Sequence, residues 1–483
     1  MREILIEQGR FLTRAVVLED GKLAAVYAEN SKTAGRVGEI YCGRVENVLS
    51  GLQAAFVDIG LPQKAFLHAQ QLAGHARIPI QKRLRAGQQV LAQVESCPGG
   101  DKGLRLTERI TLPGVALVLT PMDSAVGVSR RIGGEERREA LKAMVRDMLP
   151  EGIGAILRTA AADFTREQLR RECEALLAQW NEILARQVER SAPGLLGAEN
   201  ALSLRVVRDH MAPGVRLTVQ GQGGGLAAAL AFIRRFLPEQ LAQVQSFAEP
   251  GSLMEARGLD KPLRELQHRR VWLKSGGFLL IERTQAMTVI DVNTGKFTGK
   301  GDFEDTILRT NLEAAAEAAR QLRLRDVGGM VVIDFIDMAR ESAREQVLAA
   351  LREAFAEDRN RVQVLGFTRL GLVELRRQRL GYGLDEALGQ ECSACGGTGQ
   401  IDAHAWLLER ACAAAARLAV HRDCACVALR LPAQTVQALK EIEKEDTPLA
   451  QRPIAVYTDS GVMPGQYAVQ GLDTRPQGAD AWL

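Results

Sequence analysis

The chain has few cysteines, few histidines and no long apolar run. Its 483 residues include eight cysteines and six histidines. The cysteines are unevenly spaced, so they do not form the disulfide framework of a small secreted protein. No apolar run approaches the ~18 residues that a membrane-spanning helix needs, and no basic-then-apolar segment opens the chain. We therefore expect a cytoplasmic protein without a transmembrane segment.

Net charge is also small, at +3, and by itself indicates nothing about nucleic acid. The length allows roughly two to four domains. Phosphate binding depends on local charge rather than on the total, and the basic residues are clustered. The clusters are Arg130–Arg131, Arg137–Arg138, Arg264–Arg270 and Arg369–Arg379. Each either touches RNA or is the solvated face of a helix, and the second interpretation fits Arg137–Arg138 well.

Two apolar runs that each carry a carboxylate are the most informative part of the chain. The first, Met287–Asn293, alternates as a strand does, so Asp291 and Asn293 project from the same face. The second, Met330–Phe335, is apolar and β-branched enough for a buried strand, with Asp334 in its middle or at its end. A carboxylate in such a run is costly to bury unless something pairs with it.

The segment between the two runs, Phe303–Arg325, has apolar residues at helical spacing, and Gly328–Gly329 is expected to stop it. A crossover of this length makes the two strands parallel and allows them to be neighbours. Asp291, Asn293 and Asp334 would then converge on one point. Two acids and an amide are hard oxygen ligands, which suit Mg²⁺.

The alternative is that Asp291 and Asn293 merely open a loop, because Asp and Asn are common turn formers. Asp337, three residues after Asp334, would face the opposite way on a strand and is left out of the site. This core segment contains no histidine, so a metal-free mechanism with a histidine base is disfavoured.

Three motifs in this region resemble the ribonuclease E/G family. They are D-V-N-T-G at 291–295, T-N-L-E-A-A at 310–315 and V-I-D-F-I-D-M at 332–338. The resemblance covers nearly the whole sequence. The chain lacks the long Pro- or Arg-rich tail that one branch of the family carries, so we expect it in the shorter branch.

The resemblance implies a multidomain fold of α/β and β parts. It predicts a ribonuclease H-like subdomain that carries an S1 barrel and a 5′-sensor region as insertions. A DNase I-like α/β catalytic subdomain, a zinc-link and a small C-terminal domain would follow. The expected bounds, in that order, are 1–37 with 215–285, 38–119, 120–214, 286–390, 391–400 and 401–483.

Between about residues 38 and 110, short runs of alternating apolar and polar residues are separated by glycines. They indicate the strands of a β-barrel of the OB type. The sequences of these strands are similar to those of S1 domains, which bind RNA. This resemblance makes Phe56 and Phe66 candidates for stacking on bases and Lys102 the basic contact. Phenylalanines on strands are more often core residues, and that alternative stays open.

A strand at 153–157 ends in Arg158 and Thr159, just ahead of a helix that Asp163 or Thr165 would cap. The guanidinium and the hydroxyl could hold a terminal phosphate, although such a pair is commonly structural. In the ribonuclease E/G family, an Arg-Thr pair at this point forms the sensor for the RNA 5′-monophosphate. By the same resemblance, the pocket is lined by Gly114, Val118 and Arg130.

Cys392 and Cys395, followed directly by glycines, have the spacing of a zinc knuckle. Structural zinc takes four ligands, so one knuckle supplies half of a site. Three further cysteines could complete it within the chain: Cys412, Cys424 and Cys426. The family instead shares one zinc between two protomers, which implies a homodimer and allows a dimer of dimers. Ser393 stands where the family usually has proline.

Together these features predict a Mg²⁺-dependent endoribonuclease that acts on single-stranded RNA. Hydrolysis by a metal-activated water leaves a 5′-phosphate and a 3′-hydroxyl. The resemblance implies stimulation by a 5′-monophosphate and roles in rRNA processing and mRNA turnover. Two rival hypotheses are a non-catalytic RNA-binding scaffold of the S1 type, which needs neither aspartate, and a metal-dependent DNA nuclease.

Overall fold

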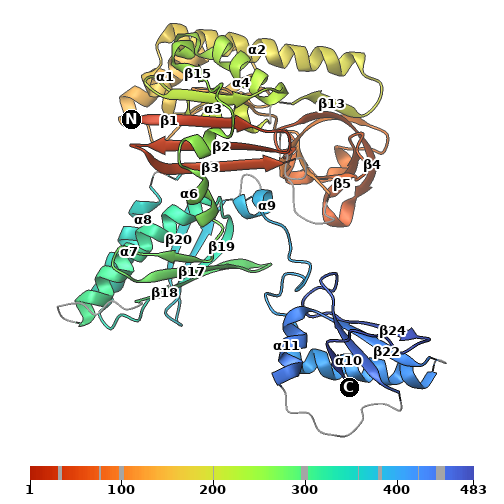
Figure 1. The fold of residues 1–483 in the computed structure, drawn as a ribbon. Coiled ribbons are helices and arrows are strands. Elements are labelled where there is room, and N and C mark those ends of the chain that lie inside the picture. Colours follow the sequence, from red (N-terminus) through yellow and green to blue (C-terminus); the bar gives the residue numbers. More distant parts are fainter. Residues whose placement is uncertain are drawn as a thin grey trace. The chain divides into compact units, whose positions relative to one another are not determined.

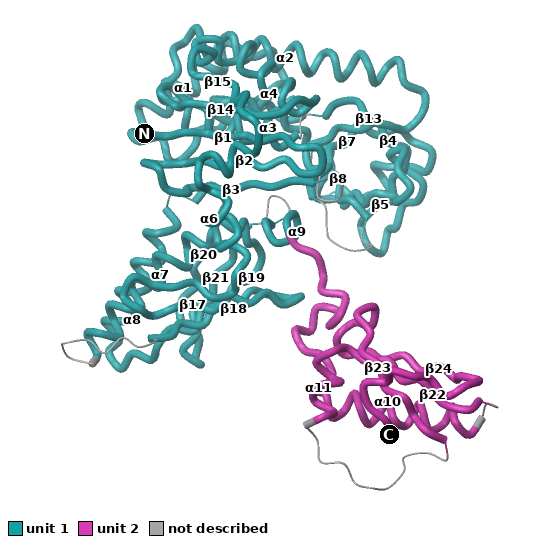
Figure 2. The backbone as a smooth tube through the Cα atoms, viewed as in Figure 1, with its two compact units in different colours: residues 1–388 teal, residues 389–483 magenta. Residues whose placement is uncertain are grey.

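The structure, a computed structural model, forms two compact units, residues 1–388 and 389–483 (Figure 2). None of the helices within the described ranges is long and apolar enough to cross a membrane. The described ranges are 1–30, 35–74, 78–96, 103–198, 201–294, 303–356, 358–378, 383–421, 424–441 and 452–483.

The first sheet of the larger unit joins the start of the chain to a strand far along the sequence (Figure 1). β14 pairs in parallel with β1, and a turn at Asp20 and Gly21, both with positive φ, connects β2 to β3. The strand order is β15-β14-β1-β2-β3. The bounds are β1 Arg2–Gln8, β2 Leu12–Glu19, β3 Lys22–Asn30, β14 Arg216–Gly221 and β15 Val244–Ser246.

The second sheet closes into a five-stranded barrel, because β4 pairs with both β5 and β7. The prediction of a small OB-like barrel in this part of the chain is confirmed. β13, Gly194–Gly197, adds to the end of β4. The barrel strands are β4 Ile40–Leu49, β5 Ala54–Asp58, β6 Ala65–His68, β7 Gln89–Ser96 and β8 Arg105–Thr107.

A four-stranded sheet of order β11-β12-β10-β9 follows the barrel in sequence. Its strands are β9 Leu112–Pro113, β10 Leu117–Thr120, β11 Val126–Val128 and β12 Gly154–Leu157. β9 and most of β10 lie before residue 120, so the sheet draws on residues assigned from the sequence to the barrel. Helix α2 packs beside it, and Thr165 caps this helix with Gln168 in a capping box, so Thr165 rather than Asp163 is the cap. The longer helices are α1 Glu135–Arg146, α2 Arg166–Glu189, α3 Leu202–His210 and α4 Gly224–Phe236.

A six-stranded sheet of order β16-β17-β18-β19-β21-β20 carries the two acidic runs. Helices α7 and α8 pack against one face of this sheet (Figure 1), where Leu279, Ile290 and Ile333 are fully buried. Val292 and Leu375 join the same core. We call the opposite face the open face. The elements are β16 Arg270–Trp272, β17 Phe278–Arg283, β18 Met287–Asn293, α7 Phe303–Leu324, β19 Gly329–Asp334, α8 Glu341–Ala354, β20 Val362–Phe367 and β21 Val373–Arg377. The sheet therefore begins well before residue 286.

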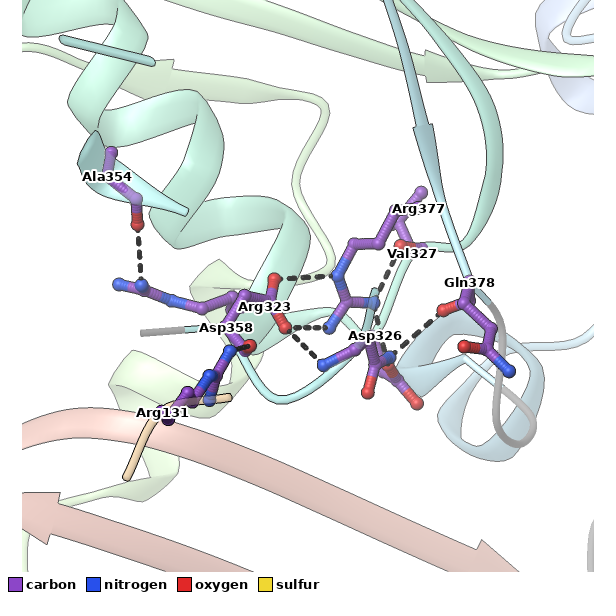
Figure 3. Close-up of polar contacts among 9 residues, drawn as sticks. Arg131, Arg323, Asp326, Val327, Ala354, Asp358, Arg377 and Gln378 are labelled. Atoms are coloured by element: carbon purple, nitrogen blue, oxygen red, sulfur yellow. Dashed lines mark hydrogen bonds and ion pairs between the residues drawn. The ribbon is translucent and has the colours of Figure 1, made fainter. Parts of the chain in front are cut away.

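Helix α7 ends at Leu324, and Asp326, two residues later, adopts a left-handed conformation with φ of 47°. The helix therefore stops before the glycine pair expected from the sequence. The amide of Val327 bonds back to the Leu322 carbonyl, which is a Schellman-type ending. The buried guanidinium of Arg377 holds this turn, with bonds to Asp326, Asp358 and the Val327 carbonyl (Figure 3).

The smaller unit has an alanine-rich helix followed by a strand-helix-strand segment. β22 and β23 pair in parallel on either side of α11, in a sheet of order β24-β22-β23-β25. The bounds are α10 His404–His421, β22 Cys426–Leu431, α11 Ala433–Glu441, β23 Ile454–Thr458, β24 Ala468–Leu472 and β25 Ala481–Trp482.

The short helices of the larger unit are α5 Leu253–Ala256, α6 Asp260–Glu265 and α9 Leu384–Leu388.

Candidate active site

The two predicted catalytic aspartates lie side by side on neighbouring strands. β18 and β19 are parallel, as predicted, and Asp291 is paired in register with Asp334. Along β18, Ile290 and Val292 are buried while Asp291 and Asn293 are partly exposed. Both carboxylates therefore project from the open face, away from α7 and α8.

Asn293 contacts the first of these carboxylates directly. Its Nδ2 donates to Asp291 Oδ2 at 2.8 Å, which fixes the carboxylate, and no hydrogen bond from the described residues reaches Oδ1. Asp334 is the last residue of β19 and is exposed, so the expected cost of burying its charge is small. Partial desolvation and the nearby charges of Asp291 and Asp337 raise the pKa of Asp334.

Asp337 is a residue that the sequence analysis set aside on a wrong premise. β19 ends at Asp334, so strand alternation does not apply three residues later. The negative charge of Asp337 instead acts on Asp334. The loop between them is held by the buried Asn311 of α7, which exchanges two hydrogen bonds with the backbone of Ile336 at 2.8 and 3.1 Å. This buried asparagine lies in the 310–315 motif.

The donor set around Asp291 and Asp334 suits a hard cation that keeps most of its waters. Within the described residues, no group of three or more His, Cys, Asp or Glu side chains is arranged to enclose a metal ion. A closed site of the zinc type is thereby disfavoured here. Mg²⁺ commonly binds through one or two carboxylates and retains several waters, so the pair of aspartates with Asn293 fits it.

The predicted 5′-phosphate residues come together where β12 ends. Arg158 donates to the Gly114 carbonyl and to Asp209 Oδ1, each at 2.8 Å. Thr159 begins a 3₁₀ helix, and its hydroxyl is 3.2 Å from that of Ser129. Val118 on β10 lies opposite Ile156 of β12, and the exposed Arg130 follows Ser129 directly.

Glu172, a residue the sequence did not single out, fixes the loop that presents Gly114. This buried carboxylate of α2 accepts hydrogen bonds from the amides of Ala116 and Leu117, although burial raises its pKa to about 7. A Cβ at position 114 would lie 2.1 Å from Glu172 Oε1. Glycine is therefore required at this position by the close approach.

The two barrel phenylalanines face each other across β5 and β6. Phe56 pairs in register with Phe66, and their rings meet edge to face with centroids 6.0 Å apart. Phe56 is 38% exposed, so the pair lies at the barrel surface and outside its core. Lys102, the predicted basic partner, lies outside the described residues.

A large cavity of about 3590 Å³ runs through the larger unit. Its walls include barrel residues such as Arg105 and Thr107. They also include Arg131, and Trp272 and Leu280 of the six-stranded sheet, which we call the catalytic sheet because it carries the predicted catalytic aspartates. Leu280 is the register partner of Asp291, so the cavity reaches within one strand of the carboxylates. Basic side chains outnumber acidic ones in the lining, sixteen to ten. By contrast, Arg137 bonds to the Ala162 carbonyl, and Arg138 bonds to the Ile132 carbonyl and to Glu135.

The cysteine knuckle forms the turn that its glycines require. Gly396, Gly397 and Gly399 all have positive φ, and the Gly399 amide donates to Cys395 Sγ at 3.3 Å. That hydrogen bond lowers the pKa of the Cys395 thiol, which favours the thiolate that zinc binds. Cys424 and Cys426 are buried in the core of the smaller unit. Over the described part of the chain, neither they nor Cys412 forms a metal-binding cluster with the knuckle.

Comparisons with known proteins place the chain among enzymes that cleave RNA. The model of the ribonuclease E/G family matches residues 111–380, which include Arg158, Asp291 and Asp334. Ribonuclease G of Haemophilus influenzae is 39% identical over 401 residues, which cover 80% of this chain and 82% of that protein. Ribonuclease G of Escherichia coli K12 is 38% identical over 418 residues, or 83% of this chain and 84% of that protein. Ribonuclease E of Nostoc is 38% identical over 400 residues, but these cover only 58% of its length.

The chain belongs to the ribonuclease E/G family. Both the predicted family and the predicted class, an endoribonuclease, are confirmed by these matches.

Proposed function

We propose that the protein is a Mg²⁺-dependent endoribonuclease of the ribonuclease G type. It would cleave single-stranded RNA and leave 5′-phosphate and 3′-hydroxyl ends. The observation that carries the proposal is the pairing of Asp291 with Asp334 on the open face, with Asn293 bonded to the first. Through the family resemblance, we extend the proposal to rRNA processing and mRNA turnover.

In this proposal Asp291 and Asp334 hold the cation, and Asn293 orients the Asp291 carboxylate. A bound Mg²⁺ would make a water nucleophilic and stabilise charge at the phosphate. The Asp337 charge strengthens the negative potential at Asp334, and the Asn311 bonds to Ile336 keep that loop in place. Asp291 and Asp334 thus supply negative charge where a cation and the phosphate must meet.

We further propose that the barrel and the Arg158 cluster select the substrate. The barrel and β9–β13 would correspond to the S1 and 5′-sensor parts, and the two flanking sheets to the ribonuclease H-like and DNase I-like parts. Phe56, Phe66 and Lys102 would bind unpaired bases and phosphates. Arg158 and Thr159, with Gly114, Val118 and Arg130, would bind a 5′-monophosphate. Cytoplasmic RNA would be the substrate.

We also propose that Cys392 and Cys395 provide half of a zinc site that two protomers share. Cys424 and Cys426 are buried in the smaller unit, and among the described residues they form no metal-binding cluster with the knuckle. This supports a shared site over an intrachain site. Zinc would then be structural and would hold a homodimer together.

The test of the active site is cleavage by Asp291→Asn and Asp334→Asn. Each variant should lose cleavage by at least roughly a hundredfold, since it removes a charge that holds the cation, while RNA binding and the fold are retained. Glu374→Gln is the matched control, because Glu374 is an exposed carboxylate on the same face, next to Val332 of β19. Full activity in either aspartate variant contradicts the proposal and favours the RNA-binding scaffold.

A further inference from the structure

Three side chains at the edge of the catalytic sheet form an exposed aromatic and cationic cluster. Trp272 of β16 is 65% exposed, and its ring meets that of Phe278 edge to face with centroids 5.5 Å apart. The Arg270 guanidinium lies 4.6 Å from the centre of the Phe278 ring and 5.8 Å from that of Trp272. We call these residues the edge cluster. Trp272 leaves most of its indole in water beside a second ring and a cation, so the cluster offers a surface on which a flat ring can stack.

The edge cluster lies on the same face as the two aspartates. Val271 and Leu279 pack into the core beneath α7 and α8, so Arg270, Trp272 and Phe278 point the other way. Trp272 pairs with Phe278, which pairs with Asn293. The indole therefore lies two strand spacings, or about 10 Å, from the strand that carries Asp291.

The hairpin that presents the edge cluster is anchored. The Leu273 amide bonds to the Gly277 carbonyl, and Gly276 has a φ of 93°, which makes the turn tight. The carboxylate of Glu313 on α7 accepts the amides of Lys274 and Ser275 at 2.6 and 3.1 Å. The rings are thus held before any ligand arrives, which lowers the entropy lost on binding.

The local charge favours an anionic, flat-ringed ligand. Within the described residues, neither Arg270 nor Lys274 has an ion-pair partner, while the neighbouring Arg269 pairs with Glu282. Trp272, Arg270 and Lys274 all line the basic cavity that leads to Leu280, beside Asp291. Single-stranded RNA combines unstacked bases with phosphates, and aromatic rings beside arginine bind that combination without regard to sequence.

We propose that the edge cluster is a base-stacking subsite for the RNA strand that enters the active site. Trp272 and Phe278 bind one unstacked base, and Arg270 binds an adjacent phosphate. The subsite sits on the Asn293 side of the aspartate pair, so it fixes one nucleotide near the scissile bond. This inference rests on the proposed function.

The test measures equilibrium binding in an Asp334→Asn background, so that it does not depend on cleavage. The probe is a 5′-monophosphorylated, AU-rich, single-stranded RNA with a fluorophore at its 3′ end. Trp272→Ala should weaken binding about tenfold, and Trp272→Phe should restore most of it, because stacking needs only a ring. Trp406→Ala is the matched control, since Trp406 is 58% exposed but lies in the smaller unit.

A second arm places an abasic nucleotide at each position of the RNA in turn. One abasic position should weaken binding to the protein with Trp272 and have no effect on the Trp272→Ala variant. Unchanged affinity in Trp272→Ala, or abasic effects that are the same in both proteins, would overturn the subsite. If Asp334→Asn still cleaves but the Trp272 effect appears, the active-site proposal fails and the subsite stands.

Discussion

The guanidinium of Arg158 is shared between a backbone carbonyl and a carboxylate, and this sharing determines what it can bind. One nitrogen bonds to the Gly114 carbonyl and the other to Asp209. Asp209 also pairs with Arg208, so its charge stays compensated when Arg158 turns toward another anion. The positive charges of Arg208 and Arg158 hold the pKa of Asp209 well below its usual range, against the effect of burial. Arg158 is thus pre-positioned by contacts that a phosphate could replace.

Arg158→Ala should abolish the faster cleavage of 5′-monophosphate RNA over 5′-hydroxyl RNA. A charge-assisted contact to a phosphate contributes enough to produce a preference of roughly tenfold or more. The measurement compares kcat/KM for the two RNAs. Arg170→Ala serves as the control, because Arg170 is an exposed arginine of α2 whose ion-pair partners among the described residues are Glu167 and Glu174. A preference that survives in Arg158→Ala argues against the sensor.

At the scale of elements, the turn between α7 and β19 places the second aspartate, and Arg377 holds that turn. Arg377 is 4% exposed and bonds to Asp358, which is 2% exposed, and to Asp326 at the end of α7 (Figure 3). Arg131, next to the predicted sensor residue Arg130, donates to the Asp358 carbonyl at 2.6 Å. The network therefore connects the four-stranded sheet region to the catalytic sheet.

Arg377→Ala should lower the free energy of unfolding of the larger unit by about 3 to 5 kcal/mol, because it leaves a buried carboxylate without its partner. Arg376→Ala, at an exposed position one residue earlier on the same strand, should change it by less than about 0.5 kcal/mol. Urea unfolding of the two variants checks the difference. Equal stability of the two variants would contradict the role of Arg377 in stabilising this turn.

The strand-helix-strand unit could be predicted from the sequence because its periodicities are strong and local. The alternation at Met287–Asn293 and the helical spacing from Phe303 fix the parallel pair and the shared face of Asp291 and Asn293. The barrel was predictable for the same reason. The end of α7 was not, because Asp326 is an uncommon left-handed residue stabilised by the distant Arg377.

Other parts of the site depend on contacts between segments far apart in the sequence. Glu172 bonds to amides more than fifty residues away, and no local pattern marks it. The edge cluster was missed because β16 and β17 are short and precede the catalytic motif, so they were assigned to another subdomain. The order of strands in a sheet cannot be derived from alternation alone. That order places the strand of Trp272 in the same sheet as Asp291, and the register then puts both side chains on one face.

At the scale of the whole molecule, the proposed zinc knuckle would be half of a site that a second protomer completes. Cys392→Ser with Cys395→Ser should then release zinc and convert a dimer into monomers, because four ligands are needed to close a structural site. Wild-type protein should hold one zinc per two chains. Sedimentation and metal analysis measure both quantities, and Cys412→Ser is the control on α10. A double variant that remains dimeric and keeps its zinc contradicts the shared site.

The most direct test of the central claim is the cleavage of a short, AU-rich, single-stranded RNA with a 5′-monophosphate, first in Mg²⁺ and then in EDTA. We predict internal cuts in Mg²⁺, with 5′-phosphate and 3′-hydroxyl ends, and none in EDTA. The paired carboxylates need a cation to activate water. Cutting that continues in EDTA, or tight binding without any cutting in Mg²⁺, would contradict the assignment of Asp291 and Asp334 as its centre.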